Sequence, residues 1–140
     1  DAGKANEHSL ITQYTQYDKD GRLLQSVDPN GVVSQYAYDP RGHLLSQSVG
    51  GQTTTYSYYP TELLEQITQP DGSTFVHMAY DDAHRLTDVS DNLGNTIHYV
   101  LDNAGNRTEE DTKDPSGALT QLLQRSFDAL GRVQQVTGRE

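Results

Sequence analysis

The sequence contains no cysteine and no tryptophan, and only two of its 140 residues are phenylalanine. The absence of cysteine excludes disulfides and thiol catalysis, and it disfavours a structural zinc site. Hydrophobic residues make up 33% of the chain, which is below their share in an ordinary globular domain. Nine tyrosines therefore carry most of the bulky apolar surface, and their hydroxyls suit positions with one wet end.

Basic residues are also scarce, with 10 Lys and Arg against 20 Asp and Glu and a formal net charge of −10. Nucleic-acid binding depends on basic patches that displace counterions from phosphates, so no nucleic-acid partner is expected. Anionic membrane surfaces are disfavoured for the same reason. No apolar run approaches the roughly 18 residues of a transmembrane helix, so no membrane insertion is expected.

One pattern recurs six times, and in its full form an aromatic residue and an aspartate are followed by a turn ending in glycine and then by a leucine. The copies occupy residues 17–23, 38–44, 58–64, 80–86, 101–107 and 127–133. Their first residues are 21, 20, 22, 21 and 26 positions apart, and such a near-constant period indicates a repeat protein. The residues that define the repeat are Tyr17, Asp18, Gly21, Arg22, Tyr38, Asp39, Gly42, Tyr58, Tyr80, Asp81, Arg85, Asp102, Gly105, Phe127, Asp128, Gly131 and Arg132.

A second set of turn motifs lies between these copies. Four of them share a polar first residue and a glycine at the fourth position, at residues 28–31, 69–72, 91–94 and 114–117, and Gly50-Gly51 fills the remaining place. Asp at the first position and Gly at the fourth are typical of a type I turn, in which the Asp side chain bonds the turn backbone. Turns about every ten residues with short strands between them predict an all-β chain.

The segments between turns have the composition of strands, with residues 33–38, 53–58 and 96–101 as the best examples. Returning strands are expected at 23–27, 44–49, 63–67, 86–89 and 133–136, and a strand rather than a helix at 118–126. One hairpin buries too little apolar surface to offset the entropy of ordering its residues. Neighbouring hairpins must therefore pair, which predicts a continuous antiparallel sheet that grows hairpin by hairpin.

The repeat is irregular in places. The third copy has Tyr59 and Glu62 where Asp and Gly are expected, and the fourth has His84 in place of Gly. We interpret residues 1–13 as a leading segment or incomplete repeat, and residues 14–140 as six repeats. The longer last spacing predicts an irregular insertion around 109–118.

The pattern Tyr-x-Tyr-Asp-x-x-Gly-Arg-Leu, the Asp-Pro-x-Gly turns and segment 101–108 resemble the RHS/YD-repeat family, over roughly residues 14–138. This family includes bacterial polymorphic toxins, insecticidal-toxin components and the animal teneurins. The resemblance implies a spiralling sheet that forms one segment of an RHS-type β-cocoon around a C-terminal toxin domain. It also implies a structural part of a larger secreted or cell-surface bacterial protein, with the rest of that chain and its toxin as partners.

A carbohydrate- or protein-binding repeat module at the cell surface is the alternative function. Rows of tyrosines, at Tyr36, Tyr38, Tyr56, Tyr58 and Tyr59, have rings on which sugars can stack. Related hairpin repeats that bind choline or glucans build their sites from tryptophan, which is absent here. Exposed edge strands at both ends also predict self-association.

No enzyme is expected, because the nucleophile elbow, the P-loop and the dinucleotide fingerprint are all absent, and no cofactor is implied. Residues 114–119 resemble the family's autoproteolytic element, but Ala118 interrupts it and 28–31 has the same form, so a plain turn is the better interpretation. The histidines lack metal-pair spacing, and His77 and His98 are expected to form a solvent-facing ladder. The acidic turns lack the distal bidentate Glu of a calcium loop.

Overall fold

The computed structural model describes residues 11–139, with the side chain of residue 139 left out. Most of the predicted leading segment 1–13, including His8, lies outside the described residues. All the regular secondary structure described is β-strand. The strands are β1 (Gln13–Tyr17), β2 (Leu23–Val27), β3 (Val33–Tyr38), β4 (Leu44–Val49), β5 (Gln52–Tyr58), β6 (Leu64–Thr68), β7 (Phe75–Tyr80), β8 (Leu86–Asp91), β9 (Thr96–Leu101), β10 (Arg107–Lys113), β11 (Leu119–Phe127) and β12 (Val133–Arg139).

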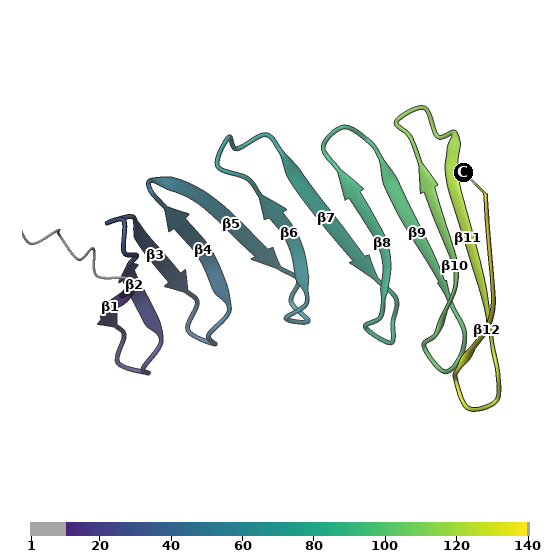
Figure 1. Cartoon of the computed structure of the whole chain (residues 1–140), viewed down its shortest axis with the longest axis horizontal. Coiled ribbons are helices and arrows are strands. Elements are labelled where there is room, and N and C mark those ends of the chain that lie inside the picture. The colour runs from purple at the N-terminus through teal and green to yellow at the C-terminus, as the bar shows by residue number, and fades with distance from the viewer. Residues whose placement is uncertain (1–10, 140) are drawn as a thin grey trace, which may run out of the picture. The chain divides into compact units, whose positions relative to one another are not determined.

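The order of the strands in the sheet is their order in the chain, and neighbours within each compact unit pair antiparallel (Figure 1). The units comprise residues 1–56 and 57–140. The all-β fold of antiparallel hairpins is therefore confirmed. No segment within residues 11–139 has the helical length and hydropathy of a membrane span.

The predicted strands match the observed ones closely, and β3 and β9 have the predicted bounds. Residues 119–127 form strand β11, as the repeat pattern indicated. The region around 109–118, where an irregular insertion is expected, has a register shift between Thr112 and Lys113. It contains most of β10 and a regular turn at 114–117. The last two copies are 26 residues apart, and the two strands between them are long, with seven residues in β10 and nine in β11. The paired residues of these strands satisfy each other's backbone groups.

In the second unit, the register separates an apolar face from a polar one. Across β7, β8 and β9, Met78 lies opposite Val89, and Val89 lies opposite Ile97. The next row is formed by the sequence neighbours of these residues. In it, Ala79 lies opposite Asp88, and Asp88 lies opposite His98. Because successive strand residues point to opposite faces, the apolar row and the charged row lie on different faces of the sheet.

In the first unit, polar side chains lie on both faces of β3 and β4. Tyr36 lies opposite Gln47, whereas its neighbours Gln35 and Ala37 lie opposite Ser48 and Ser46. The burial of β3 alternates along the strand, with Tyr36 and Tyr38 half-buried and the residues between them exposed. Tyr36 and Tyr38 therefore lie on the more buried face of β3.

The described residues contain no buried hydrophobic side chain, and the only buried residue among them is Ser26, at 7% exposure. The sheet therefore has no second layer packed against it within the described chain, although stable domains normally bury an apolar face against another element. Ladder hydrogen bonds, half-buried cross-strand pairs and the turns stabilise this fold.

Two turns adopt a left-handed conformation at a residue other than glycine. Glu62 has φ of 69° and His84 has φ of 62°, at the positions where the other copies have Gly. For L-residues this conformation costs about 1–2 kcal/mol. The third and fourth copies therefore keep the turn geometry despite losing the glycine.

Replacing His84 by glycine is expected to raise the free energy of unfolding by about 0.5–1 kcal/mol, since the gain in backbone geometry exceeds the entropy cost of glycine. Urea denaturation followed by circular dichroism measures the change. His84→Ala is the matched control, because it removes the ring but keeps the backbone penalty. Equal stabilisation by alanine and glycine would contradict this explanation.

Candidate functional site

Nine turns share the same two backbone hydrogen bonds. The first residue accepts from the N–H three positions on and donates to the carbonyl four positions on, at 2.9–3.2 Å. This is the three-residue hairpin loop in which a type I turn is followed by a left-handed residue. The nine turns begin at Asp18, Asp28, Asp39, Tyr59, Asp81, Asp91, Asp102, Asp114 and Asp128. Gly50-Gly51 forms a two-residue loop, and the turn at Gln69 is one residue longer.

An aspartate carboxylate closes eight of these nine turns. Its Oδ1 accepts the backbone N–H of the residue four positions on, at 2.8–3.0 Å in every case. In Asp102, for example, Oδ1 accepts from the amides of Ala104 and Asn106, both at 2.9 Å. The predicted contact between the Asp side chain and the turn backbone is present, and it satisfies amides that the short loop leaves unpaired.

The side chain at the fifth turn position contacts the other carboxylate oxygen. Arg22 Nε donates to Asp18 Oδ2 at 2.6 Å, and Asn106 Nδ2 donates to Asp102 Oδ2 at 2.9 Å. His43 Nδ1 lies 2.8 Å from Asp39 Oδ2. Arginine, asparagine and histidine therefore do the same work in different copies, by presenting one N–H to the turn carboxylate.

The first residue of a copy is the last residue of its strand, and in most copies it is an aromatic residue that lies opposite an aliphatic residue after the turn. Tyr17 pairs with Leu23, Tyr38 with Leu44 and Tyr80 with Leu86. Phe127 pairs with Val133 in the last copy, and Leu101 with Arg107 in the fifth. Aromatic–aliphatic pairs of this kind contribute to sheet stability, so the repeat pattern encodes a cross-strand contact beside each turn.

Tyr59 stands where the third copy lacks its aspartate. Its hydroxyl donates to the carbonyl of Met78 at 3.0 Å and lies 3.3 Å from His77 Nε2. Its ring contacts the Tyr80 ring edge-on, with centroids 6.2 Å apart, and the Tyr80 hydroxyl donates to the carbonyl of Leu64 at 2.9 Å. Partial burial raises the pKa of Tyr80. The tyrosines therefore link two neighbouring hairpins in the copy whose turn has lost its carboxylate.

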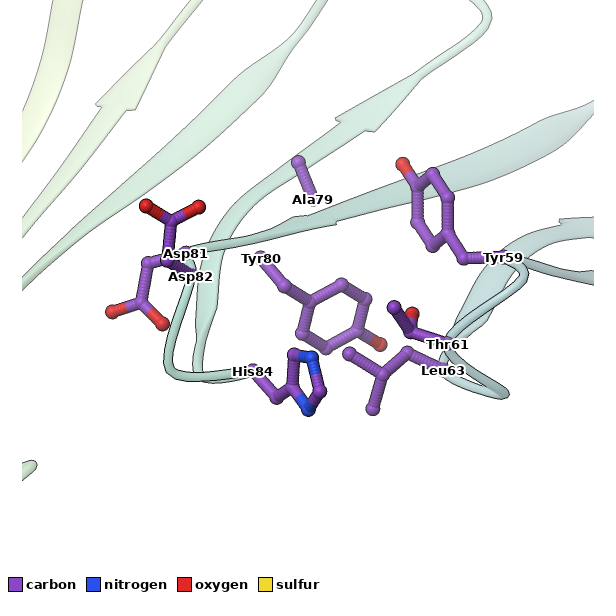
Figure 2. Close-up of a pocket in the computed structure, with 8 residues that line it drawn as sticks. All are labelled: Tyr59, Thr61, Leu63, Ala79, Tyr80, Asp81, Asp82 and His84. Carbon is purple, nitrogen blue, oxygen red and sulfur yellow. The ribbon is translucent and has the colours of Figure 1, made fainter.

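An open hollow of about 310 Å³ lies between the turn at 59–63 and the end of β7, as Figure 2 shows. Its lining is Tyr59, Thr61, Leu63, Ala79, Tyr80, Asp81, Asp82 and His84. Asp81 is engaged by its own turn, where it accepts from the backbone and side chain of Arg85. The hollow therefore offers aromatic rings, the turn-bound carboxylate of Asp81 and a second carboxylate at Asp82, and its rings suit shallow apolar or stacking contacts.

His77 and His98 lie on the polar face of the second unit, on strands separated by β8. His77 lies opposite Ser90, and His98 lies opposite Asp88, whose Oδ1 is 2.7 Å from His98 Nδ1. Each histidine has a different partner, Tyr59 for His77 and Asp88 for His98. Within the described residues, no group of three or more His, Asp or Glu side chains is arranged to hold a metal ion.

The repeat-defining residues lie around the turns of the hairpins β1–β2, β3–β4, β7–β8, β9–β10 and β11–β12, and Tyr58 is the last residue of β5. Two functional details were missed by sequence reasoning. Tyr59 links its turn to the next hairpin, and the fifth turn position carries a side-chain donor in most copies. Aligning the copies would have found the second signal, since Arg22, His43, Arg85, Asn106 and Arg132 occupy equivalent positions.

Hydrogen bonds lower the pKa values of Asp18, Asp39, Asp81, Asp91, Asp102, Asp114 and Asp128. The His43 side chain holds the pKa of Asp39 at about 2, with the backbone of the same turn adding to the effect. The Asn106 side chain lowers the pKa of Asp102, and the Arg22 backbone N–H lowers that of Asp18. In each case the charged carboxylate is the better acceptor, so the folded turn favours the ionised form.

These shifts predict acid sensitivity. A carboxyl whose pKa is lower when folded binds its proton more readily when unfolded, so protonation favours unfolding. Stability is expected to be complete above about pH 4, near the value of an unperturbed Asp, and to fall towards pH 2 as Asp39 is protonated. Urea denaturation at a series of pH values measures this fall. Asp39→Asn is expected to reduce its slope, and an unchanged slope would contradict the assignment.

The chain was compared with protein families, with curated proteins and with solved structures. The RHS repeat family model matches residues 17–50 and 80–119, which together make up just over half of the chain. No match is found among curated proteins.

Among solved structures, the chain is similar to crystal structures of TcdB2-TccC3-TEV and TcdB2-TccC3-Cdc42, with TM-scores of 0.77 and 0.78. It is also similar to a structure of the Photorhabdus luminescens Tc holotoxin pore, with a TM-score of 0.76. In all three, sequence identity is 16% and the match covers 91% of this chain. It covers only 7–8% of the matched chains. At this identity the likeness shows the fold, and together with the family match it establishes that the chain belongs to the RHS repeat family.

Proposed function

We propose that this chain is a stretch of wall in a larger bacterial RHS protein, which is secreted or displayed at the cell surface and encloses a C-terminal toxin domain. Its role is structural rather than catalytic. Its partners are the rest of the parent chain and the enclosed domain. The curved, spiralling form of an RHS β-cocoon is part of the same proposal.

The placement of an apolar row and a charged row on opposite faces of β7, β8 and β9 carries this proposal. A wall has two sides in different surroundings, and a sheet with period-2 alternation supplies them. The turn carboxylates support a structural role, because they are occupied by backbone amides of their own turns. The family match and the likeness to Tc toxin structures point in the same direction.

The division of residues 14–140 into six repeats, with residues 1–13 as a leading segment, belongs to this proposal. It is supported by the recurrence of one turn geometry at the equivalent positions of the six copies. The seventeen repeat-defining residues would then be those that shape a turn or pair beside it.

Limited proteolysis of the full-length parent protein tests enclosure. The domain that follows the repeats is expected to resist trypsin while the wall is folded. Gly105→Pro is expected to make it digestible, because proline cannot adopt the φ of 86° found there and removes the N–H donated to Asp102. Asn103→Pro is the matched control, since proline occupies that second turn position in the turns at Asp28 and Asp39. Equal digestion with and without an intact wall would contradict enclosure.

Binding of a sugar or protein at the cell surface remains the second candidate, and one observation favours it. Tyr14 and Tyr17 on β1 are 60% and 56% exposed, so their rings are open to a ligand. The tyrosines from Tyr36 to Tyr59 are half-buried instead. A glycan array is expected to give no binding. Binding that is lost in Tyr14→Ala and Tyr17→Ala would favour this second function.

Self-association of the isolated 140-residue chain through its terminal strands β1 and β12 is a further part of the proposal. These are the first and last strands in the order of the sheet, and Val133 and Val136 on β12 are each 54% exposed. Edge strands of this kind template pairing with another chain. Light scattering at high protein concentration is expected to detect dimers or chains, and a strict monomer would contradict this expectation.

A further inference from the structure

Arg22 joins two successive turns on the same edge of the first unit. Its Nε donates to the carboxylate of its own turn, Asp18 Oδ2, at 2.6 Å. Its Nη1 donates to the backbone carbonyl of Asp39 at 3.1 Å, and Asp39 opens the turn of the next repeat. One guanidinium therefore bonds two turns whose first residues are a whole repeat apart.

Arg85 repeats this arrangement in the second unit. Its Nε donates to Asp81 Oδ2 at 2.8 Å, and its Nη1 donates to the carbonyl of Asp102 at 2.8 Å. In both cases the accepting carbonyl lies 17 residues ahead of the arginine. Two independent occurrences with the same atoms and the same spacing indicate a built feature of the repeat.

The surroundings of Arg22 fit a guanidinium specifically. Its Cζ lies 5.5 Å from the centroid of the Tyr38 ring, within the range of a cation–π contact. A Cβ on Gly42 would lie 3.2 Å from Arg22 Nη1, so the glycine of the next turn leaves room for this group. Lysine has a single nitrogen and cannot bond a carboxylate and a distant carbonyl with separate donors in a fixed fork.

We propose that the arginine at the fifth turn position is the positioning residue that holds one hairpin's turn in alignment with the next. The carboxylate of its own turn orients the guanidinium, and the second donor then fixes the carbonyl of the following turn. This role goes beyond the wall function proposed above and holds whatever the wall encloses. The arginine of the Gly-Arg-Leu part of the motif thereby forms a contact between successive repeats.

Asn106 occupies the fifth turn position in the turn that begins at Asp102, and its side chain is shorter than that of arginine. Its Nδ2 bonds its own turn at Asp102 Oδ2. Its Oδ1 lies 4.0 Å from the point where a Cβ on Gly131 would stand, beside the next turn on the same edge. This matches the placement of Arg22 next to Gly42, so a longer, forked donor at position 106 would meet the carbonyl of Asp128.

The variant Arg85→Lys tests the effect of losing the arginine's contact with the next turn. Arg132→Lys is the matched control. Arg132 bonds Asp128 in the same way, at 2.7 Å, but belongs to the last described hairpin and has a side chain that is 74% exposed. Amide hydrogen exchange by NMR reports on the Gly105 N–H, which donates to the Asp102 carbonyl, and on the rest of β9–β10. Arg85→Lys is expected to lower protection there by about tenfold or more, the scale of one lost hydrogen bond to a charged group.

The control is expected to leave protection in β9–β10 unchanged. A loss confined to the arginine's own turn at 81–85, with β9–β10 unaffected, would overturn the proposal. So would an equal loss in β9–β10 from both variants, because that would reflect general destabilisation.

Gain of the contact is tested with Asn106→Arg, which does not depend on a variant that loses stability. Protection of the Gly131 amide and of β11–β12 is expected to rise by about tenfold, since one charged hydrogen bond to the Asp128 carbonyl is added. Asn106→Lys adds the same charge without the fork and is expected to give less than a twofold change. If arginine protects β11–β12 no more than lysine does, the proposal is wrong.

Discussion

The hydrogen bonds between a turn aspartate and the amides of its own turn are the interaction on which the rest of this structure depends. Because the described chain buries no hydrophobic side chain, the usual dominant source of stability is weak here. The antiparallel ladder must then be held at its ends. Each turn carboxylate does this by accepting the N–H four residues on, which starts the returning strand in register.

Fixing the turns leaves the strand faces free to serve different surroundings. Met78, Val89 and Ile97 form an apolar row on one face of the second unit, while Asp88 and His98 lie on the other. A sheet built in this way extends by adding hairpins, and each addition needs only a turn and its cross-strand pair. Extension by one hairpin at a time suits the wall proposed above. This chain matches only a small part of each solved relative.

Much of this architecture could be predicted from the sequence, because turn chemistry is local. Asp, Pro and Gly at fixed offsets place the turns, and the spacing between them places strands such as β3 and β9. The persistence of the turns at Glu62 and His84 was not predictable from residue preferences, since the paired strands on both sides impose the left-handed backbone. The bonds from Arg22 and Arg85 to the next repeat also escaped prediction, because they depend on how successive turns stack in space.

The central claim is that one carboxylate secures a whole hairpin, and amide hydrogen exchange of Asp102→Ala tests it most directly. Asn103→Ala, at an exposed position in the same turn, is the matched control. The account predicts that Asp102→Ala lowers protection along the full lengths of β9 and β10, whereas the control leaves both strands unchanged. Loss of protection confined to the amides of Ala104 and Asn106, which bond the carboxylate directly, would contradict it.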